Sequence, residues 1–291
     1  MPTNPRRKRI EETLAMFIAR LACLFLLIVH TGVRAQAAAP PTLYLGSVAM
    51  EVPAEMVKRL TPLAAYLTAQ TGMQIAFRAS PNMDAAITDL GNGVTSVAYM
   101  APVAYLDARR RQGVQPLVAP LTNGKSTFRL VLAVKQASPL RSVAELKGRS
   151  FAFGDERARL QQAVVVGAGV ALAEFSRYAF LKHYDNIAKA VLNDDFDAGI
   201  LTESAFQEFA PRGLRVLHTS PPLPGYLFVV NSNLPPATVA KLRAAFLALR
   251  AEVPAHRDIL HAIDKAYEGF APAQDKDYDT VRTLITPFAA K

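Results

Sequence analysis

Polar and aromatic side chains follow three apolar runs of this 291-residue chain, at points where strands are predicted to end. In open α/β sheets, small molecules bind beyond the carboxyl ends of the strands, so these side chains are candidates for ligand contacts. The arginines among them suit an anion, because a guanidinium group pairs with a carboxylate or phosphate through parallel hydrogen bonds. The candidate ligand-binding residues are Tyr99, Tyr105, Arg157, Arg159, His183, Tyr184, Asp185 and Glu203.

Five of these candidates also have a purely structural interpretation, which the sequence leaves open. The two tyrosines suit core or surface packing, and the two arginines suit the solvated first turn of a helix. Asp185 precedes a helical pattern, where aspartate is a preferred N-cap because its side chain accepts a hydrogen bond from a backbone N–H. The positions of these side chains in the fold decide between the two interpretations.

Catalysis finds little support in the same sequence. There is no Gly-rich phosphate loop, and Gly91-Asn92-Gly93 predicts a turn. There is no His-x-x-x-His motif and no pair of cysteines for a metal site. Ser176 and Ser204 lack the strand–turn–helix context of a nucleophilic serine. We therefore expect a protein without catalytic residues, metal ligands or cofactors.

Residues 1–37 have the pattern of a cleavable export signal. Basic residues at 6–9 precede an apolar run at 21–29, and Ala35-Gln36-Ala37 has the small-x-small form of a cleavage site. A membrane anchor is the alternative, but a spanning helix needs about 20 apolar residues and this run is shorter. We therefore predict an exported chain that begins near residue 38.

Loss of this segment changes the charge and the redox chemistry of the chain. It carries six Arg and Lys residues and two glutamates, so the net charge falls from +9 to +5. A moderately basic surface of this kind gives no specific support for nucleic-acid binding. Cys23, the one cysteine, also lies in the segment, so the exported chain has no disulfide and relies on core packing.

Strand and helix patterns alternate through the rest of the chain, which is long enough to bury a substantial core. Repeated strand–helix units predict an α/β fold with a mainly parallel sheet covered by helices. The predicted strands are 42–47, 73–78, 96–100, 128–135, 150–153, 196–201, 214–219 and 227–230. The predicted helices are 53–70, 83–90, 102–112, 142–146, 158–175, 186–192, 203–209, 236–251, 256–268 and 277–288. Ser142 and Thr202 are predicted N-caps, and Glu145 is placed to complete a capping box with Ser142.

Three motifs follow the predicted signal: AYMAPVAY at 98–105, LKGRSFAFGD at 146–155 and NDDFDAGI at 193–200. In this order they resemble the periplasmic solute-binding proteins of the phosphonate-type ABC uptake family, within the type 2 periplasmic binding protein superfamily. The resemblance implies a two-lobed α/β fold of the Venus-flytrap type, with mixed sheets flanked by helices. It places residues 42–125 and 225–291 in lobe 1 and residues 126–224 in lobe 2.

The resemblance also implies a function. The chain would be a periplasmic, monomeric receptor that closes on a small anionic or polar solute in a cleft between the lobes and then docks on a membrane permease. Two alternatives remain open: the same fold presents its ligand to a sensor kinase, or it is a scaffold that has lost its ligand. None of these functions involves nucleic acid.

The resemblance assigns roles to several of the candidate residues. In the family an aromatic residue after the third strand packs over the ligand; Tyr99 matches it, and Tyr105 matches a second aromatic in the same segment. Asp185 matches a family Asp, and the family His before it falls on Tyr184 or, with a one-residue shift, on His183. Glu203 lies just beyond the strand that contains the FDAG motif.

Two departures from the family pattern bear on the ligand. The family binds an oxyanion with a Ser/Thr pair after the strand that ends in Phe-Gly-Asp, whereas this chain has Arg157 and Arg159 there. Many members also place an Asp or Asn soon after the Pro-Pro-x-Pro segment, where this chain has Gly225 and Tyr226. An anionic ligand agrees with the arginines, but the sequence does not choose between phosphonate and another anion.

Overall fold

The computed structural model describes residues 42–47, 53–156 and 159–286. The predicted export signal and Arg157 lie outside these ranges. Within them, strands and helices alternate as predicted, and the strands form two large sheets and one small one.

The larger sheet has six strands in the order β13-β4-β12-β3-β1-β2. β1 pairs in parallel with β2 and β3, as the repeated strand–helix units predict, but β12 is antiparallel to both β3 and β4, and β13 is antiparallel to β4. The sheet is therefore mixed. Its strands are β1 (Leu43–Ser47), β2 (Ile75–Phe77), β3 (Val97–Met100), β4 (Gln115–Leu121), β12 (Leu227–Val230) and β13 (Gly269–Pro272).

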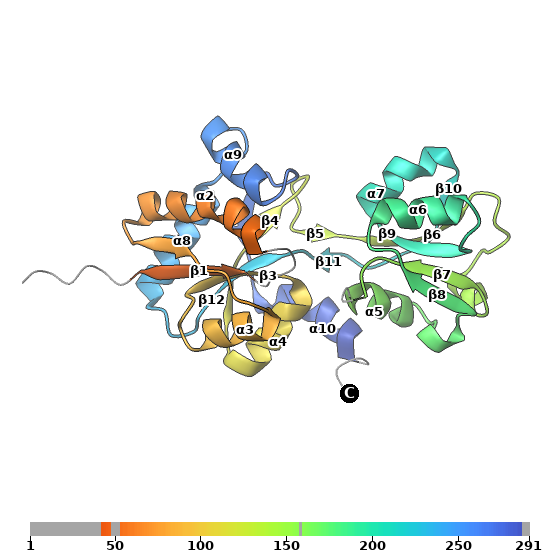
Figure 1. Cartoon of the computed structure of the whole chain (residues 1–291), viewed down its shortest axis with the longest axis horizontal. Coiled ribbons are helices and arrows are strands. Elements are labelled where there is room, and N and C mark those ends of the chain that lie inside the picture. Colours follow the sequence, from red (N-terminus) through yellow and green to blue (C-terminus); the bar gives the residue numbers. More distant parts are fainter. Residues whose placement is uncertain (1–41, 48–52, 157–158, 287–291) are drawn as a thin grey trace, which may run out of the picture. The chain divides into compact units, whose positions relative to one another are not determined.

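Helices cover both faces of this sheet (Figure 1). Side chains alternate between the faces along a strand, so Val97 and its neighbour Ala98 pack into different clusters. One face packs against α2 (Pro53–Thr71), α8 (Pro236–Ala248) and α9 (Pro254–Ile263). The other packs against α3 (Met83–Gly91), α4 (Pro102–Gln112) and α10 (Asp279–Ile285).

The second sheet has five strands in the order β10-β6-β9-β7-β8. β7 pairs in parallel with both β8 and β9, while β6 is antiparallel to β9 and β10. The strands are β6 (Leu130–Lys135), β7 (Ser150–Phe153), β8 (Arg177–Phe180), β9 (Ala198–Thr202) and β10 (Leu214–Thr219). α5 (Arg159–Gly167) packs on the face that carries Phe151 and Phe153, and α6 (Tyr184–Leu192) and α7 (Glu203–Phe209) pack on the other face.

Two short strands connect the segments that build the two sheets (Figure 1). β5 (Thr127–Phe128) and β11 (Leu223–Pro224) pair antiparallel, so the outgoing and returning chain run beside each other. The larger sheet draws its strands from residues 43–121 and 227–272, and the five-stranded sheet from residues 130–219. The lobe boundaries at 125/126 and 224/225 remain a prediction.

Several predicted elements differ from the structure. Strand β4 was not predicted, because Pro116 and Pro120 interrupt its pattern and proline is disfavoured inside a sheet. The predicted strand at 128–135 divides at Arg129 into β5 and β6. The predicted helix at 158–175 stops at Gly167, and Gly169 then takes φ +104°, a left-handed conformation that favours glycine.

The helix caps give a mixed result. Thr202 caps α7 as predicted, since its Oγ1 accepts a hydrogen bond of 3.3 Å from the N–H of Ala205. Ser142 stands at the N-cap of a 3-10 turn, Val143–Leu146, but its side chain makes no capping bond. Glu145 accepts a 2.7 Å bond from the N–H of Arg141, and the reciprocal capping box is incomplete because the Ser142 side chain lacks its bond.

Candidate functional site

Tyr99 lies near the carboxyl end of β3 within a group of aromatic residues. Its ring stacks on Tyr226, with 5.0 Å between ring centroids and planes 23° apart, and it contacts Phe228 at 4.9 Å. Its hydroxyl forms a hydrogen bond with the hydroxyl of Tyr267. We call Tyr99, Tyr226 and Tyr267 the tyrosine cluster. It joins β3 to the segments that precede β12 and β13.

The tyrosine cluster presents neutral hydroxyl groups. Burial raises the pKa of Tyr99 well above its ordinary value, and Tyr267 raises it further. Burial likewise raises the pKa of Tyr267, with Asp264 adding to the effect. Ser47, at the end of β1, is paired in register with Tyr99, so a serine hydroxyl lies beside the tyrosines at the same edge of the sheet. Neutral phenols at this edge suit hydrogen bonding and stacking rather than charge pairing.

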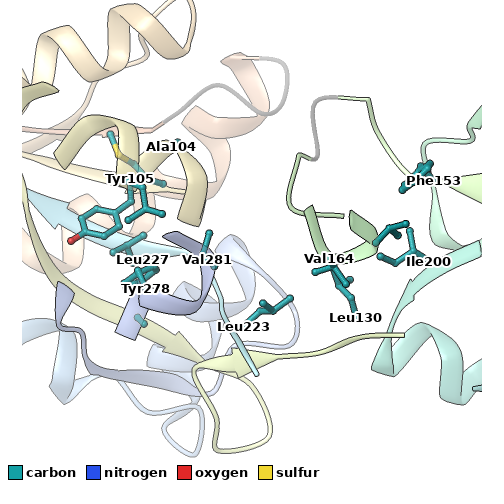
Figure 2. Packing of buried hydrophobic residues seen from close by; sticks show 14 of the residues in the cluster. Ala104, Tyr105, Leu130, Phe153, Val164, Ile200, Leu223, Leu227, Tyr278 and Val281 are labelled. Carbon is teal, nitrogen blue, oxygen red and sulfur yellow. The ribbon is translucent and has the colours of Figure 1, made fainter. Parts of the chain in front are cut away.

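Tyr105 is a core residue. Its side chain is fully buried, its ring meets Tyr278 edge-on at 4.8 Å, and its hydroxyl donates a hydrogen bond to Asp275. Figure 2 shows it packed with Leu227 and Tyr278. The structure thus gives Tyr105 a packing role, and it is left out of the binding proposal below.

The five-stranded sheet brings five of the other candidates to one edge. β7, β8 and β9 run parallel, so their carboxyl ends meet there. α5 follows β7, α6 follows β8 and α7 follows β9, and each helix begins with residues at this edge. The five are Arg159, His183, Tyr184, Asp185 and Glu203; all but the half-buried Tyr184 are exposed.

Asp185 does not cap α6. His183 occupies the N-cap position, without a side-chain capping bond, and Asp185 lies in the first turn of the helix. The N-cap interpretation is therefore wrong. An acid in the first turn still stabilises the helix through its dipole, and the exposed carboxylate is left at the sheet edge.

Gln161 is a buried polar residue at the same edge, which the sequence did not single out. Its side chain is only 6% exposed and reaches from α5 to two other elements. Oε1 accepts a 2.8 Å hydrogen bond from the N–H of Gly154, and Nε2 lies 3.2 Å from the hydroxyl of Tyr184. The end of β7, the first turn of α5 and the start of α6 are thereby tied together.

Asp197 of the FDAG motif lies at the opposite edge of this sheet. Its Oδ2 accepts hydrogen bonds from Ser150 N–H at 2.8 Å and from Ser150 Oγ at 2.7 Å. Ser150 begins β7 and Asp197 directly precedes β9, so the carboxylate fixes the amino ends of two paired strands. The aspartate of this motif therefore has a structural role.

The bonds to Asp197 predict a pH dependence of stability. Burial alone would raise the pKa of Asp197, but the hydrogen bonds from Ser150 outweigh it and hold the pKa below its ordinary value. A lowered native pKa stabilises the fold above the unfolded pKa of about 3.9 and loses that contribution as pH falls through the native value. Urea unfolding of wild type and Asp197→Asn should therefore differ most above about pH 5 and converge as the pH falls below about 3.9. An equal difference at every pH would contradict this role.

Three residues that the sequence analysis missed contact predicted ones: Tyr226, Tyr267 and Gln161. Tyr226 appeared only as a lost polar contact, and Tyr267 was placed inside a helix that in fact ends at Ile263. Their signal was weak, because the contacts with Tyr99 span 127 and 168 positions of sequence. Gln161 did have a signal: a Gln in the first turn of a helix, seven residues after a strand-ending glycine.

The part of the chain that the structure describes shows neither a cluster of metal ligands nor a membrane-spanning helix. No three His, Cys, Asp or Glu side chains gather there as a metal site. None of the helices described is long and apolar enough to cross a membrane.

Comparison with known proteins gives a match along most of the chain. The family model for the periplasmic substrate-binding protein of phosphonate ABC transporters matches residues 45–278. The phosphate-import protein PhnD of Mycolicibacterium smegmatis is 22% identical over 273 residues, covering 84% of each chain. The motif resemblance is therefore confirmed.

Solved structures show the same fold. XAC2383 from Xanthomonas citri, bound to ATP, has a TM-score of 0.67 and 19% identity, covering 84% of this chain and 95% of its own. PhnD1 from Prochlorococcus marinus, in complex with methylphosphonate, has a TM-score of 0.63 and 20% identity, covering 85% of this chain and 98% of its own. The predicted α/β fold of periplasmic binding proteins, with mixed sheets flanked by helices, is confirmed.

Proposed function

Because this chain belongs to the periplasmic substrate-binding proteins of phosphonate ABC transporters, we propose that it binds a small phosphorus oxyanion for uptake. The relatives named above support this ligand class, since one imports phosphate and others were solved with methylphosphonate and ATP. Each of these molecules presents phosphorus-bound oxygens that accept hydrogen bonds. Phosphonate and phosphate are the first two candidates.

The proposal is carried by the gathering of polar side chains at one edge of the five-stranded sheet. Arg159 and Tyr184 begin α5 and α6, which follow adjacent parallel strands. A guanidinium group and a phenol hydroxyl both donate to an oxyanion: Arg159 would do so in place of the family Ser/Thr pair, and Tyr184 in place of the family His. His183, Asp185 and Glu203 surround them and would contact the rest of the ligand. Arg157 belongs to the same turn but lies outside the described residues.

Tyr99 supplies the opposing surface in this proposal. Its ring packs against both Tyr226 and Phe228, so it is ordered before the ligand arrives. A preordered aromatic side chain loses little entropy on binding. The antiparallel pair β5–β11 would act as the hinge through which the two sheets approach each other around the ligand.

The ligand-bound form would then dock on an inner-membrane ABC permease, with the chain acting as a periplasmic monomer that carries out no catalysis. Transport is preferred to delivery to a sensor kinase because the matching family is defined as a transporter component. The same match gives no support to a scaffold that has lost its ligand.

A thermal-shift screen of residues 38–291 tests the proposed ligand class. The compounds are methylphosphonate, phosphite, phosphate, a sulfonate, a carboxylate and an amino acid. A ligand present at 100 times its dissociation constant adds about 2.7 kcal/mol of stability, which raises the melting temperature by several degrees. We expect a rise with a phosphorus oxyanion. A rise with the sulfonate or carboxylate alone would contradict the ligand class.

A further inference from the structure

The hydrogen bonds of Gln161 fix the orientation of its side-chain amide. A backbone N–H can only donate, so the Gln161 atom 2.8 Å from Gly154 N has to be the carbonyl oxygen. The other end of the amide is therefore the NH2 group, which can only donate. The Tyr184 hydroxyl, 3.2 Å from that nitrogen, must accept this bond through its oxygen.

This orientation leaves the hydroxyl proton of Tyr184 for another acceptor. In the part of the chain that the structure describes, Gln161 is the only hydrogen-bond partner of this hydroxyl. Burial raises the pKa of Tyr184, although the bond from Gln161 lowers it, so the phenol keeps its proton at neutral pH. A half-buried phenol with its oxygen already engaged is prepared to donate.

Gly154 makes the arrangement sterically possible. A Cβ at this position would lie 2.8 Å from Gln161 Nε2 and 3.0 Å from Oε1. Real Cβ atoms do not approach this closely, so any other residue would displace the amide. Gly154, which directly follows β7, thus leaves room for the side chain that orients Tyr184.

We propose that Gln161 is a positioning residue that orients the Tyr184 hydroxyl as a hydrogen-bond donor to an oxygen of the bound oxyanion. The inference rests on the proposed function and names a donor for the ligand. Gln161 itself acts through Tyr184. The contribution of Gln161 to affinity should therefore disappear when the Tyr184 hydroxyl is absent.

A double-mutant cycle measured by calorimetry, with methylphosphonate and inorganic phosphate as probes, tests the inference. Tyr184→Phe removes the donor and should weaken binding about tenfold or more, as expected for a hydrogen bond to a charged group. Gln161→Met keeps the volume but frees the hydroxyl to rotate, and should weaken binding about threefold to tenfold. The double variant should bind like Tyr184→Phe alone. Tyr178→Phe, at an exposed tyrosine on β8, is the matched control and should bind like wild type.

The outcomes separate the inference from the proposed function. The inference alone would be overturned if Gln161→Met left the affinity of the wild-type chain unchanged. It would also be overturned if Gln161→Met weakened binding equally with Tyr184 present and in Tyr184→Phe. A wild-type chain that binds neither probe would overturn the proposed function and the inference with it. If Gln161→Met does not fold, Gln161→Glu provides the test: its second carboxylate oxygen accepts from Tyr184 and turns the hydroxyl proton inward. It should weaken binding at least tenfold with Tyr184 present and less in Tyr184→Phe, and an equal loss in both would overturn the inference.

Discussion

Tyr105→Ala is expected to lower the free energy of unfolding by about 3–5 kcal/mol, the cost of deleting a large buried ring. The ring is fully buried and meets Tyr278 at 4.8 Å. Its hydroxyl bonds to Asp275, whose Oδ1 also lies 2.9 Å from Arg109 Nε and 3.0 Å from the Arg282 guanidinium. Urea unfolding followed by circular dichroism measures the loss, and calorimetry measures the affinity of the folded variant, which should be unchanged.

Two variants serve as controls for this result. Tyr105→Phe keeps the ring and removes one hydrogen bond, so its cost should be about 1 kcal/mol. Tyr178→Ala deletes a ring that is 43% exposed and should cost about 1 kcal/mol or less. If Tyr105→Ala had near wild-type stability but lost ligand affinity, the packing role would be wrong and Tyr105 would belong to the site.

Tyr99→Ala is expected to weaken methylphosphonate binding about thirtyfold, which corresponds to about 2 kcal/mol for loss of a preordered aromatic contact. Tyr99→Phe keeps the ring stacked on Tyr226 and should lose only about threefold, because only the hydroxyl bond to Tyr267 is removed. Calorimetric titration at constant salt compares the three chains.

Tyr44→Ala is the matched control, since Tyr44 is a tyrosine of the same sheet near the amino end of β1. It should bind methylphosphonate like wild type. Equal affinities for wild type and Tyr99→Ala would show that the tyrosine cluster is a structural feature of the larger sheet and contributes nothing to binding.

The sequence predicted which strands end near polar residues. It did not predict which of the nearby side chains face the hydrophobic core. Tyr99 and Tyr105 lie in one motif, yet the first lies at a strand end and the second faces the core from α4. In the folded chain the Tyr105 hydroxyl donates a hydrogen bond to the carboxylate of Asp275, 170 positions away. Contacts over such separations leave no local pattern.

The mixed topology was also beyond local patterns. The first three strands follow the strand–helix repeat and are parallel, as predicted. The antiparallel strands β12 and β13 arise because the chain returns to the larger sheet after it has formed the five-stranded sheet. Strand β4 was not predicted because Pro116 and Pro120 interrupt its pattern. The helix predicted at 236–251 ends at Ala248, because residues 249–253 turn towards β13.

Helix starts were predicted closely enough to place the candidate site. Parallel pairing of β7, β8 and β9 brings residues 159, 183–185 and 203 to one edge. The sequence did not predict β8, so this pairing is known only from the structure. The link between them, Gln161 to Tyr184, spans 23 positions and depends on the space left by Gly154. Such a buried polar bridge can be recognised only once the strand order is known.

A crystal structure of residues 38–291 with the most stabilising phosphorus oxyanion tests the central claim most directly. We predict an anion oxygen within hydrogen-bond distance of the Tyr184 hydroxyl, a second within reach of Arg159, and the Tyr99 ring in contact with the ligand. An anion bound away from the carboxyl ends of β7 and β8, with Tyr184 still bonded only to Gln161, would contradict the account.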